Sequence, residues 1–350
     1  MLFVKFAKVF GAQPSKAQKM QYQHYDNYQG GKFNNLMPQF TVIETPNFIE
    51  NSIEPKATRQ PDFDIPFVKL TTDDLTIKPK HARFTWFGHS TFLLEIDGKN
   101  IMIDPMLSAV PSPVQGIGRK RYSKGLPLTA DELPELDGVL ITHDHYDHLD
   151  YWSIKKIKAK VKTFYVPLGL SAHLLAWGVN KAQIKELNWY EDAYLDTIRL
   201  TLTPSHHYSG RSLTDRFQSL WGGWVIKGAQ DNIYLSGDGG YGSHFKEIGE
   251  KYGPFDFAMI ECGQYSRYWR QNHLFPEQSA LVAAEVQARL VMPIHWGAFT
   301  LAMHSWTAPV ERFIQRINEL AIPVTTPKIG EQFVLDPALE KPKAAWWKKP

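Results

Sequence analysis

Three histidines and two aspartates lie within the six residues from His143 to His148. Imidazole nitrogens and carboxylate oxygens are the ligands that zinc and similar divalent metals favour. With only 13 histidines in 350 residues, composition alone does not predict such a cluster. His143 and His145 can reach one metal from the same side of a short turn, and Asp147 and His148 can face a second. Two close metal ions provide a hydroxide that attacks at neutral pH, so the spacing predicts a dinuclear hydrolytic site.

The apolar, β-branched run 138–142 directly precedes this cluster and predicts a buried strand. The cluster then occupies the loop at the C-terminal end of that strand, where open α/β sheets usually carry their chemistry. A solvated surface loop is the alternative explanation of the same residues.

One loop cannot complete two coordination shells, so we expect more ligands downstream. Three further predicted strands each lead into a suitable side chain, and these are Asp238, His295 and the adjacent pair His206 and His207. Glycines around Asp238 allow the backbone to come close to a metal. Neighbouring side chains of an extended segment point to opposite sides, so only one of His206 and His207 is expected to bind.

The periodicity of apolar residues predicts strands and helices along most of the chain. We expect strands at 83–87, 91–96, 100–103, 138–142, 162–166, 197–203, 222–227, 231–236, 256–260, 290–294 and 331–335. We expect helices at 150–158, 169–177, 243–251, 276–289 and 309–321. Early strands follow one another and later strands alternate with helices. This order indicates an α/β (α+β) fold, a four-layer αββα sandwich with the metals at one edge.

Composition agrees with an enzyme that has a substantial core, since 43% of the chain is hydrophobic. A net charge of +3 is too small to indicate binding to nucleic acid. The single cysteine, Cys262, excludes an internal disulfide and fits a reducing, cytoplasmic compartment. It follows an apolar run, so we expect a buried, unreactive thiol. No apolar stretch is long enough to predict a membrane-spanning helix.

The two ends of the chain differ in composition from the rest. Residues 1–80 show little periodicity and are expected to wrap over the core as an extension, with the catalytic domain at 81–337. Residues 338–350 form an aromatic-basic tail that contains Trp346 and Trp347. Met1–Phe10 mixes large apolar residues with lysines, so both ends suggest peripheral contact with the inner membrane face. Packing of these aromatic residues on their own domain is the alternative.

The His-x-His-x-Asp-His order that begins at His143 is that of the metallo-β-lactamase superfamily, and the chain is identified as a member. Further blocks resemble a narrower family, the N-acylphosphatidylethanolamine-hydrolysing phospholipases D and their bacterial relatives. The resemblance extends from about residue 80 to about residue 330 and rests on 86–90, 142–150, 166–170, 203–207, 236–241, 253–256 and 294–297. It implies the metallo-β-lactamase fold.

The resemblance also implies a ligand set. His143, His145 and His207 would bind one zinc ion, with His207 chosen over His206 by the family's Pro-x-x-His spacing. The second zinc ion would be bound by Asp147, His148 and His295, and Asp238 would bridge the two ions. Iron or manganese can replace zinc in such sites.

The implied activity is hydrolysis of a phosphodiester in an N-acylphosphatidylethanolamine or a related glycerophospholipid, by attack of a hydroxide that bridges the metals. Asp147 and His273 would be catalytic, the latter as a general acid or phosphate contact. Tyr146 and His273 match positions near the bound phospholipid. A surface or capping role is the alternative for His273, and His89 is expected to form hydrogen bonds beneath the site.

Other activities remain open at this point. The same hydroxide can attack a lactone, a carboxylic ester or an amide, and a metal-binding protein without turnover has the same ligands. Redox diiron relatives typically carry a carboxylate where this chain has His145, which argues against that class. A small phosphodiester is an alternative substrate to the phospholipid. The oligomeric state is not predicted.

Overall fold

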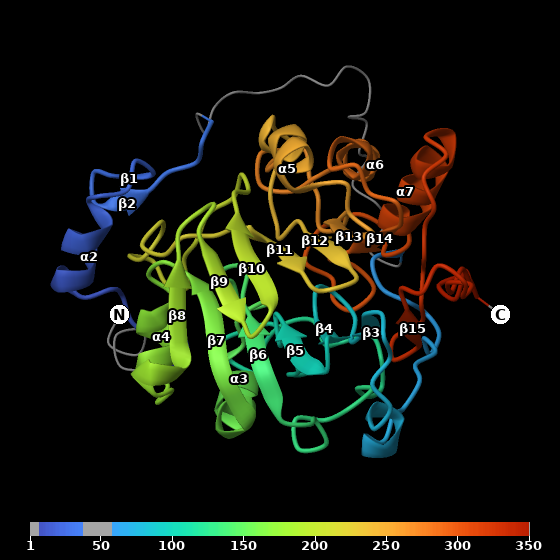
Figure 1. Ribbon diagram of the computed structural model, residues 1–350, viewed down its shortest axis with the longest axis horizontal. Coiled ribbons are helices and arrows are strands. Elements are labelled where there is room, and N and C mark those ends of the chain that lie inside the picture. The colour runs from blue at the N-terminus through green and yellow to red at the C-terminus, as the bar shows by residue number, and fades with distance from the viewer. Residues whose placement is uncertain (1–6, 38–57, 350) are drawn as a thin grey trace.

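One half of the molecule is a seven-stranded mixed sheet in the computed structural model, which describes residues 7–37 and 58–349 (Figure 1). The strand order is β15 (Gln332–Val334), β3 (Arg83–Trp86), β4 (Phe92–Ile96), β5 (Lys99–Ile103), β6 (Leu136–Leu140), β7 (Val161–Pro167) and β8 (Ile184–Leu187). Strands β5 to β8 are parallel to one another. Their C-terminal ends therefore lie along one edge of the sheet.

The other half is a six-stranded sheet. Its order is β14 (Val291–Ile294), β13 (Phe257–Glu261), β12 (Asn232–Leu235), β11 (Gly223–Lys227), β10 (Ile198–Thr203) and β9 (Asp192–Leu195). Strands β12, β13 and β14 are parallel, whereas β9 to β12 form an antiparallel meander. The two sheets share one apolar core, in which the fully buried rings of Phe84 and Phe257 lie 4.7 Å apart.

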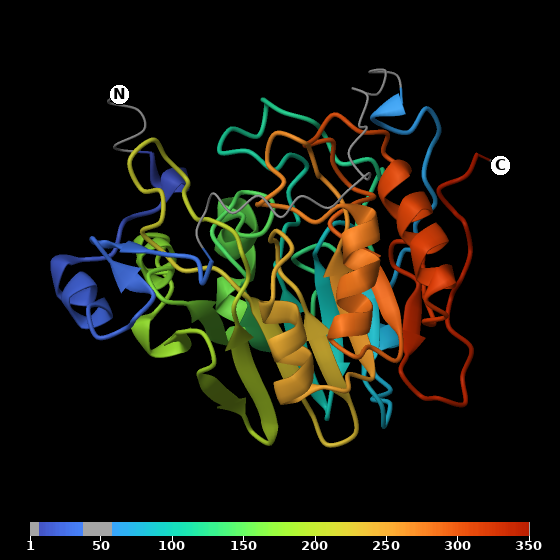
Figure 2. The same cartoon turned by 90° about the horizontal axis from the view of Figure 1, so that it is seen from above.

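Helices cover both outer faces. The seven-stranded sheet packs against α3 (Tyr151–Ile157) and α4 (Ser171–Ala176) through a separate apolar cluster. On the other side, α5 (His244–Tyr252), α6 (Pro276–Glu285) and α7 (Ala308–Glu319) lie side by side over the six-stranded sheet (Figure 2). This arrangement confirms the predicted αββα sandwich.

Most predicted elements occur within two residues of their expected bounds, with two kinds of exception. Helix α6 ends at Glu285 and does not reach 289. The chain turns there because Gln287 adopts a left-handed conformation (φ 59°), and the N–H of Arg289 then donates to Phe255 O. Strands β8 and β9 were not predicted, because each has only four residues, includes charged ones and lies at the open edge of its sheet.

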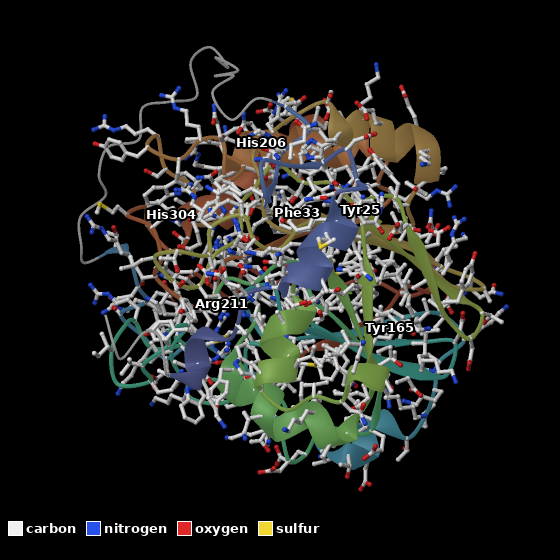
Figure 3. The ribbon with its side chains drawn as sticks, turned by 90° about the vertical axis from the view of Figure 1, so that its left-hand side faces the viewer. Tyr25, Phe33, Tyr165, His206, Arg211 and His304 are labelled. Atoms are coloured by element: carbon white, nitrogen blue, oxygen red, sulfur yellow. The ribbon has the colours of Figure 1, made fainter. Side chains whose placement is uncertain are left out.

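The N-terminal segment carries short elements of its own. They are η1 (Lys8–Phe10), α2 (Lys16–Tyr22), β1 (Tyr28–Gln29), β2 (Lys32–Phe33) and η3 (Thr72–Leu75), and two more 3-10 turns, η4 (Lys158–Lys160) and η5 (Lys181–Gln183), occur later. A capping box between Ser15 and Gln18 begins α2. The rings of Tyr28 and Phe33 lie 4.8 Å apart and join the main core, and Figure 3 shows Phe33 beside α2. Residues Met1–Phe6, part of the suggested membrane anchor, lie outside the described residues.

The C-terminal tryptophans pack on their own domain, which was the alternative to the membrane-surface interpretation. Trp346 and Trp347 are 6% and 3% exposed. The Trp346 ring stacks on Trp296 with centroids 5.2 Å apart. Burial leaves these two indoles no surface to offer a bilayer. Among the described residues, no helix is long and apolar enough to cross a membrane.

Candidate metal centre

The predicted site residues converge at the edge where the parallel strands of both sheets end. Strand β6 leads into the His143–His148 loop, β12 into Asp238 and β14 into His295. Strand β10 leads into His207. Loops from both sheets therefore meet above the core, as the position of each side chain after a strand predicted.

Three imidazoles form a first group. His143 Nε2 lies 3.0 Å from His145 Nδ1, and His207 Nε2 lies 3.2 Å from the same atom. His207 Nδ1 donates to Asn272 O at 2.8 Å, so its Nε2 is left with a free lone pair. The three nitrogens lie close enough together to bind one ion. They suit a cation that all three coordinate.

A second group combines two carboxylates with two imidazoles. Asp238 Oδ2 lies 3.1 Å from His148 Nε2 and 2.9 Å from His295 Nε2. Asp147 Oδ2 lies 3.3 Å from His295 Nε2 and 3.5 Å from His148 Nε2. Asp238 Oδ2 is also 3.8 Å from His143 Nε2. It is thus the carboxylate that connects the two groups.

His206 and His207 separate as the alternation of an extended chain requires. His207 is wholly buried within the first group. His206 pairs with Gly240 in an isolated β-bridge, and its Nδ1 has no hydrogen-bond partner within 7–37 and 58–349. Figure 3 labels His206, which lies near the helices that cover the six-stranded sheet. No cluster of possible ligands among the described residues includes it.

The electrostatics of the site favour added positive charge. Although burial raises it, the pKa of Asp238 is held well below its usual value by His148 and His295. Burial lowers the pKa of His295, but Asp238 and Asp147 together raise it to about 10. Burial and neighbouring histidines hold the pKa of His143 and His207 well below the usual value. Asp238 and Asp147 thus favour positive charge on His148 and His295, and a divalent metal supplies such charge to neutral imidazoles in place of their protons.

Two residues outside the ligand groups form hydrogen bonds with the expected ligands. Asp104 is wholly buried and accepts hydrogen bonds from His148 Nδ1 at 2.8 Å and from the Thr142 hydroxyl at 2.7 Å. His89 Nε2 donates to Asp147 Oδ2 at 2.9 Å, which confirms the role predicted for His89 beneath the site. Such partners orient a ligand and fix its tautomer.

Asp144, inside the motif, is no part of either ligand group. Its Oδ1 accepts from the Gly210 N–H at 2.8 Å, and its Oδ2 accepts from the Ser219 hydroxyl at 2.9 Å. Arg211 donates to Asp144 O at 2.6 Å and lies 4.2 Å above the Tyr146 ring. The carboxylate therefore anchors the metal loop to the segment after His207.

The two predicted substrate contacts occupy different environments. The Tyr146 hydroxyl donates to Arg211 O. The ring of His273 lies 5.1 Å from His207 and 5.2 Å from His295, so it stands over both. Tyr208, which was not predicted as a site residue, also lies beside the first group. The centroid of its ring is 4.6 Å from that of His145. Its hydroxyl has no hydrogen bond among the described residues.

A family model described as the beta-lactamase superfamily domain matches residues 99–296, more than half of the chain. This span contains every predicted metal ligand. The chain belongs to the beta-lactamase superfamily. Its fold and site make it a metal-dependent hydrolase of the metallo-β-lactamase fold.

Several superfamily relatives are similar over most of the sequence. An uncharacterized protein of Mycobacterium tuberculosis is 37% identical over 75% of this chain and 71% of its own length. N-acyl-phosphatidylethanolamine-hydrolyzing phospholipase D 1 of Caenorhabditis elegans is 35% identical over 69% of this chain and 70% of its own. The metallo hydrolase Igni18 of Ignicoccus hospitalis has the same fold, with a TM-score of 0.55 at 24% identity, covering 72% of this chain and 97% of its own.

Three residues near this superfamily site went unnoticed in the sequence, namely the buried Asp104 and Glu261 and the partly buried Asn35. Asp104 and Glu261 lie at the ends of apolar strands, which is the same signal that indicated Asp238 and His295. They have no histidine nearby in the sequence. Asn35 lies in a segment without periodicity and has no local signal. Cys262 is buried and free, as predicted.

Proposed function

We propose that this protein is a dinuclear zinc phosphodiesterase of the phospholipase D type, acting on an N-acylphosphatidylethanolamine or a related glycerophospholipid. The observation that supports this most is the pair of ligand groups joined by Asp238 at one strand edge. The relative of Caenorhabditis elegans, named for this activity, supports the choice of substrate.

In this proposal His143, His145 and His207 hold one zinc ion, while Asp147, His148 and His295 hold the other. Asp238 faces both groups and is the shared ligand. Imidazole-rich shells favour zinc, although iron or manganese has access to the same donors. When bound, two such ions activate water as a nucleophile at neutral pH and stabilise charge on the attacked phosphorus.

The chain's own residues supply the remaining contacts. Hydrolysis breaks the bond from phosphorus to the leaving oxygen, and that oxygen needs a proton. His273 stands over both ligand groups with 15% of its side chain exposed, so when its Nε2 carries a proton it can give that proton to the leaving oxygen or donate a hydrogen bond to a phosphoryl oxygen. The exposed Arg216 guanidinium lies 4.6 Å above the Tyr208 ring and offers positive charge to an anionic substrate.

Metal analysis and a substrate panel test the proposal together. Protein reloaded with zinc should contain about two ions per chain, and it should convert glycerophospholipids or small phosphodiesters to phosphomonoesters. His273→Ala should lower that turnover and keep both ions. At most one tightly bound ion would contradict the dinuclear assignment. Efficient cleavage of lactones, esters or β-lactams without phosphodiester turnover would favour the carbonyl hydrolase, whereas no turnover at all would favour a metal-binding protein.

A further inference from the structure

Glu261, the last residue of β13, is a wholly buried carboxylate beside the metal centre. Its Oε1 accepts from the N–H of Leu274 at 2.7 Å and from the N–H of Gly239 at 3.2 Å. Its Oε2 accepts from His273 Nδ1 at 3.1 Å. No Lys or Arg side chain pairs with it among the described residues. Burying a carboxylate in this way costs free energy unless hydrogen bonds compensate for its lost contacts with water.

Glu261 lies on the side of the His295 ring that is away from Asp238. Its Oε2 is 3.9 Å from His295 Nδ1, and that nitrogen faces Gly263 O at 3.3 Å. The His295 nitrogen that faces Asp238 is Nε2, on the other side of the ring. Among the described residues, the only side chain that donates a hydrogen bond to the Glu261 carboxylate is thus that of His273.

The hydrogen bonds of Glu261 connect the two loops that carry His273 and Asp238. Leu274 follows His273 directly, and Gly239 follows Asp238 directly. Both backbone N–H groups converge on the same oxygen of Glu261, which fixes these loops relative to β13. The second oxygen is left for the imidazole.

We propose that Glu261 is a positioning residue that accepts the Nδ1–H of His273 and thereby keeps His273 Nε2 for the substrate. A carboxylate accepts only, so Nδ1 must carry the proton, as in the carboxylate–histidine pairs that orient other functional imidazoles. Because Nδ1 faces the buried Glu261 and the His273 side chain is partly exposed, Nε2 is the ring nitrogen left for a ligand. The inference rests on the proposed function for the reaction that His273 serves, but the orientation itself can be measured without substrate.

The variant Glu261→Gln separates the two roles of this side chain. A glutamine oxygen still accepts from the two backbone N–H groups, while its NH₂ group meets His273 with a donor in place of an acceptor. In zinc-loaded, full-length protein labelled with ¹⁵N-histidine, NMR should show a proton on His273 Nδ1. In the variant the proton on Nδ1 should be lost, because the glutamine NH₂ group offers that nitrogen a donor and no acceptor. The His273→Ala spectrum identifies the signals.

Kinetics provide the second measurement. Glu261→Gln should lower kcat by about 10- to 100-fold with little change in KM, since the imidazole is misdirected and the binding surface is kept. In a His273→Ala background the substitution should cause no further loss, because it acts through that ring. Glu186→Gln is the matched control: Glu186 accepts from the Ser171 N–H and the Tyr22 hydroxyl, remote from the metals.

The outcomes are distinct. A His273 that carries no proton on Nδ1 in the wild-type spectrum would overturn the proposal, even if the variant does not fold. So would multiplying effects in the double variant, or loss of a zinc ion from Glu261→Gln alone. If the wild-type protein hydrolyses no phosphodiester, the proposed function fails, while the NMR measurement still decides what Glu261 does.

Discussion

The side chain of Asn35 forms two hydrogen bonds with the backbone of His207, in the manner of a neighbouring β-strand. Its Nδ2 donates to His207 O at 2.9 Å, and its Oδ1 accepts from the His207 N–H at 3.1 Å. Oδ1 also accepts from Trp221 Nε1 at 3.1 Å. The N-terminal segment thus contacts a proposed zinc ligand across 172 positions of sequence.

Asn35→Ala should weaken zinc binding at the group formed by His143, His145 and His207. The change leaves two buried backbone groups of His207 without partners, at a cost of about 1–3 kcal/mol each. We expect a loss of about 10- to 100-fold in affinity for one of the two ions, measured by competition with a chromogenic chelator. Asn34→Ala is the control, because the exposed Asn34 side chain donates to the carbonyls of Gln29 and Lys32 in its own hairpin. Equal affinities in the two variants would show that Asn35 does not position His207.

Asp147→Asn should depress turnover by on the order of a hundredfold or more. The carboxylate accepts from His89 and faces His148 and His295, so an amide replaces a charge shared by three imidazoles. Steady-state kinetics with a small phosphodiester provide the measurement, and metal analysis of the same sample shows whether an ion is lost. Near-normal turnover would place the chemistry elsewhere.

His304 should make the protein less stable in acid. Its Nε2 accepts from the Gln264 N–H at 2.8 Å and its Nδ1 donates to Ser305 O at 2.8 Å, so a second proton would break the first bond. Burial lowers the pKa of His304 to about 4 from an ordinary value of 6.5. Between these values the unfolded chain binds the proton more tightly. The free energy of unfolding should therefore fall as pH falls from about 6.5 to about 4.

Urea denaturation across this pH window measures the contribution of His304. In His304→Gln, the free energy of unfolding should fall less between these pH values, by on the order of 2 kcal/mol, since the ring is partly exposed. His24→Gln, at an exposed position of the N-terminal segment, should leave the pH profile unchanged. An unaltered profile in His304→Gln would contradict the assignment.

Trp346→Ala should destabilise the fold by about 3 kcal/mol, because a buried indole is removed and a cavity is left. The ring of Trp346 lies against that of Trp296, the residue that follows His295. The ring centroid of Trp346 is also 6.0 Å from that of Trp86. Thermal unfolding provides the measurement. Leu339→Ala, at a half-exposed position of the same tail, is the control and should change stability little.

The ligand types and their places after strands could be predicted from local sequence. The His143–His148 cluster is contiguous, and apolar runs before Asp238 and His295 reveal burial through their periodicity. Helices such as α5 and α7 begin and end near their predicted bounds for the same reason. These features depend on neighbours within a few residues, so the order of residues is sufficient.

Only the tertiary structure decided the contacts between distant segments. Asn35 meets His207, Glu261 meets His273, and Trp346 meets Trp296 because two sheets stack and loops from both cross one edge. Buried polar groups must find hydrogen-bond partners wherever packing brings them, and no local periodicity records which partner that is. The choice of His207 over His206 has both origins. Alternation showed that the two side chains diverge and the family's spacing indicated His207, while the stacking of the sheets is what brings that side chain to His143.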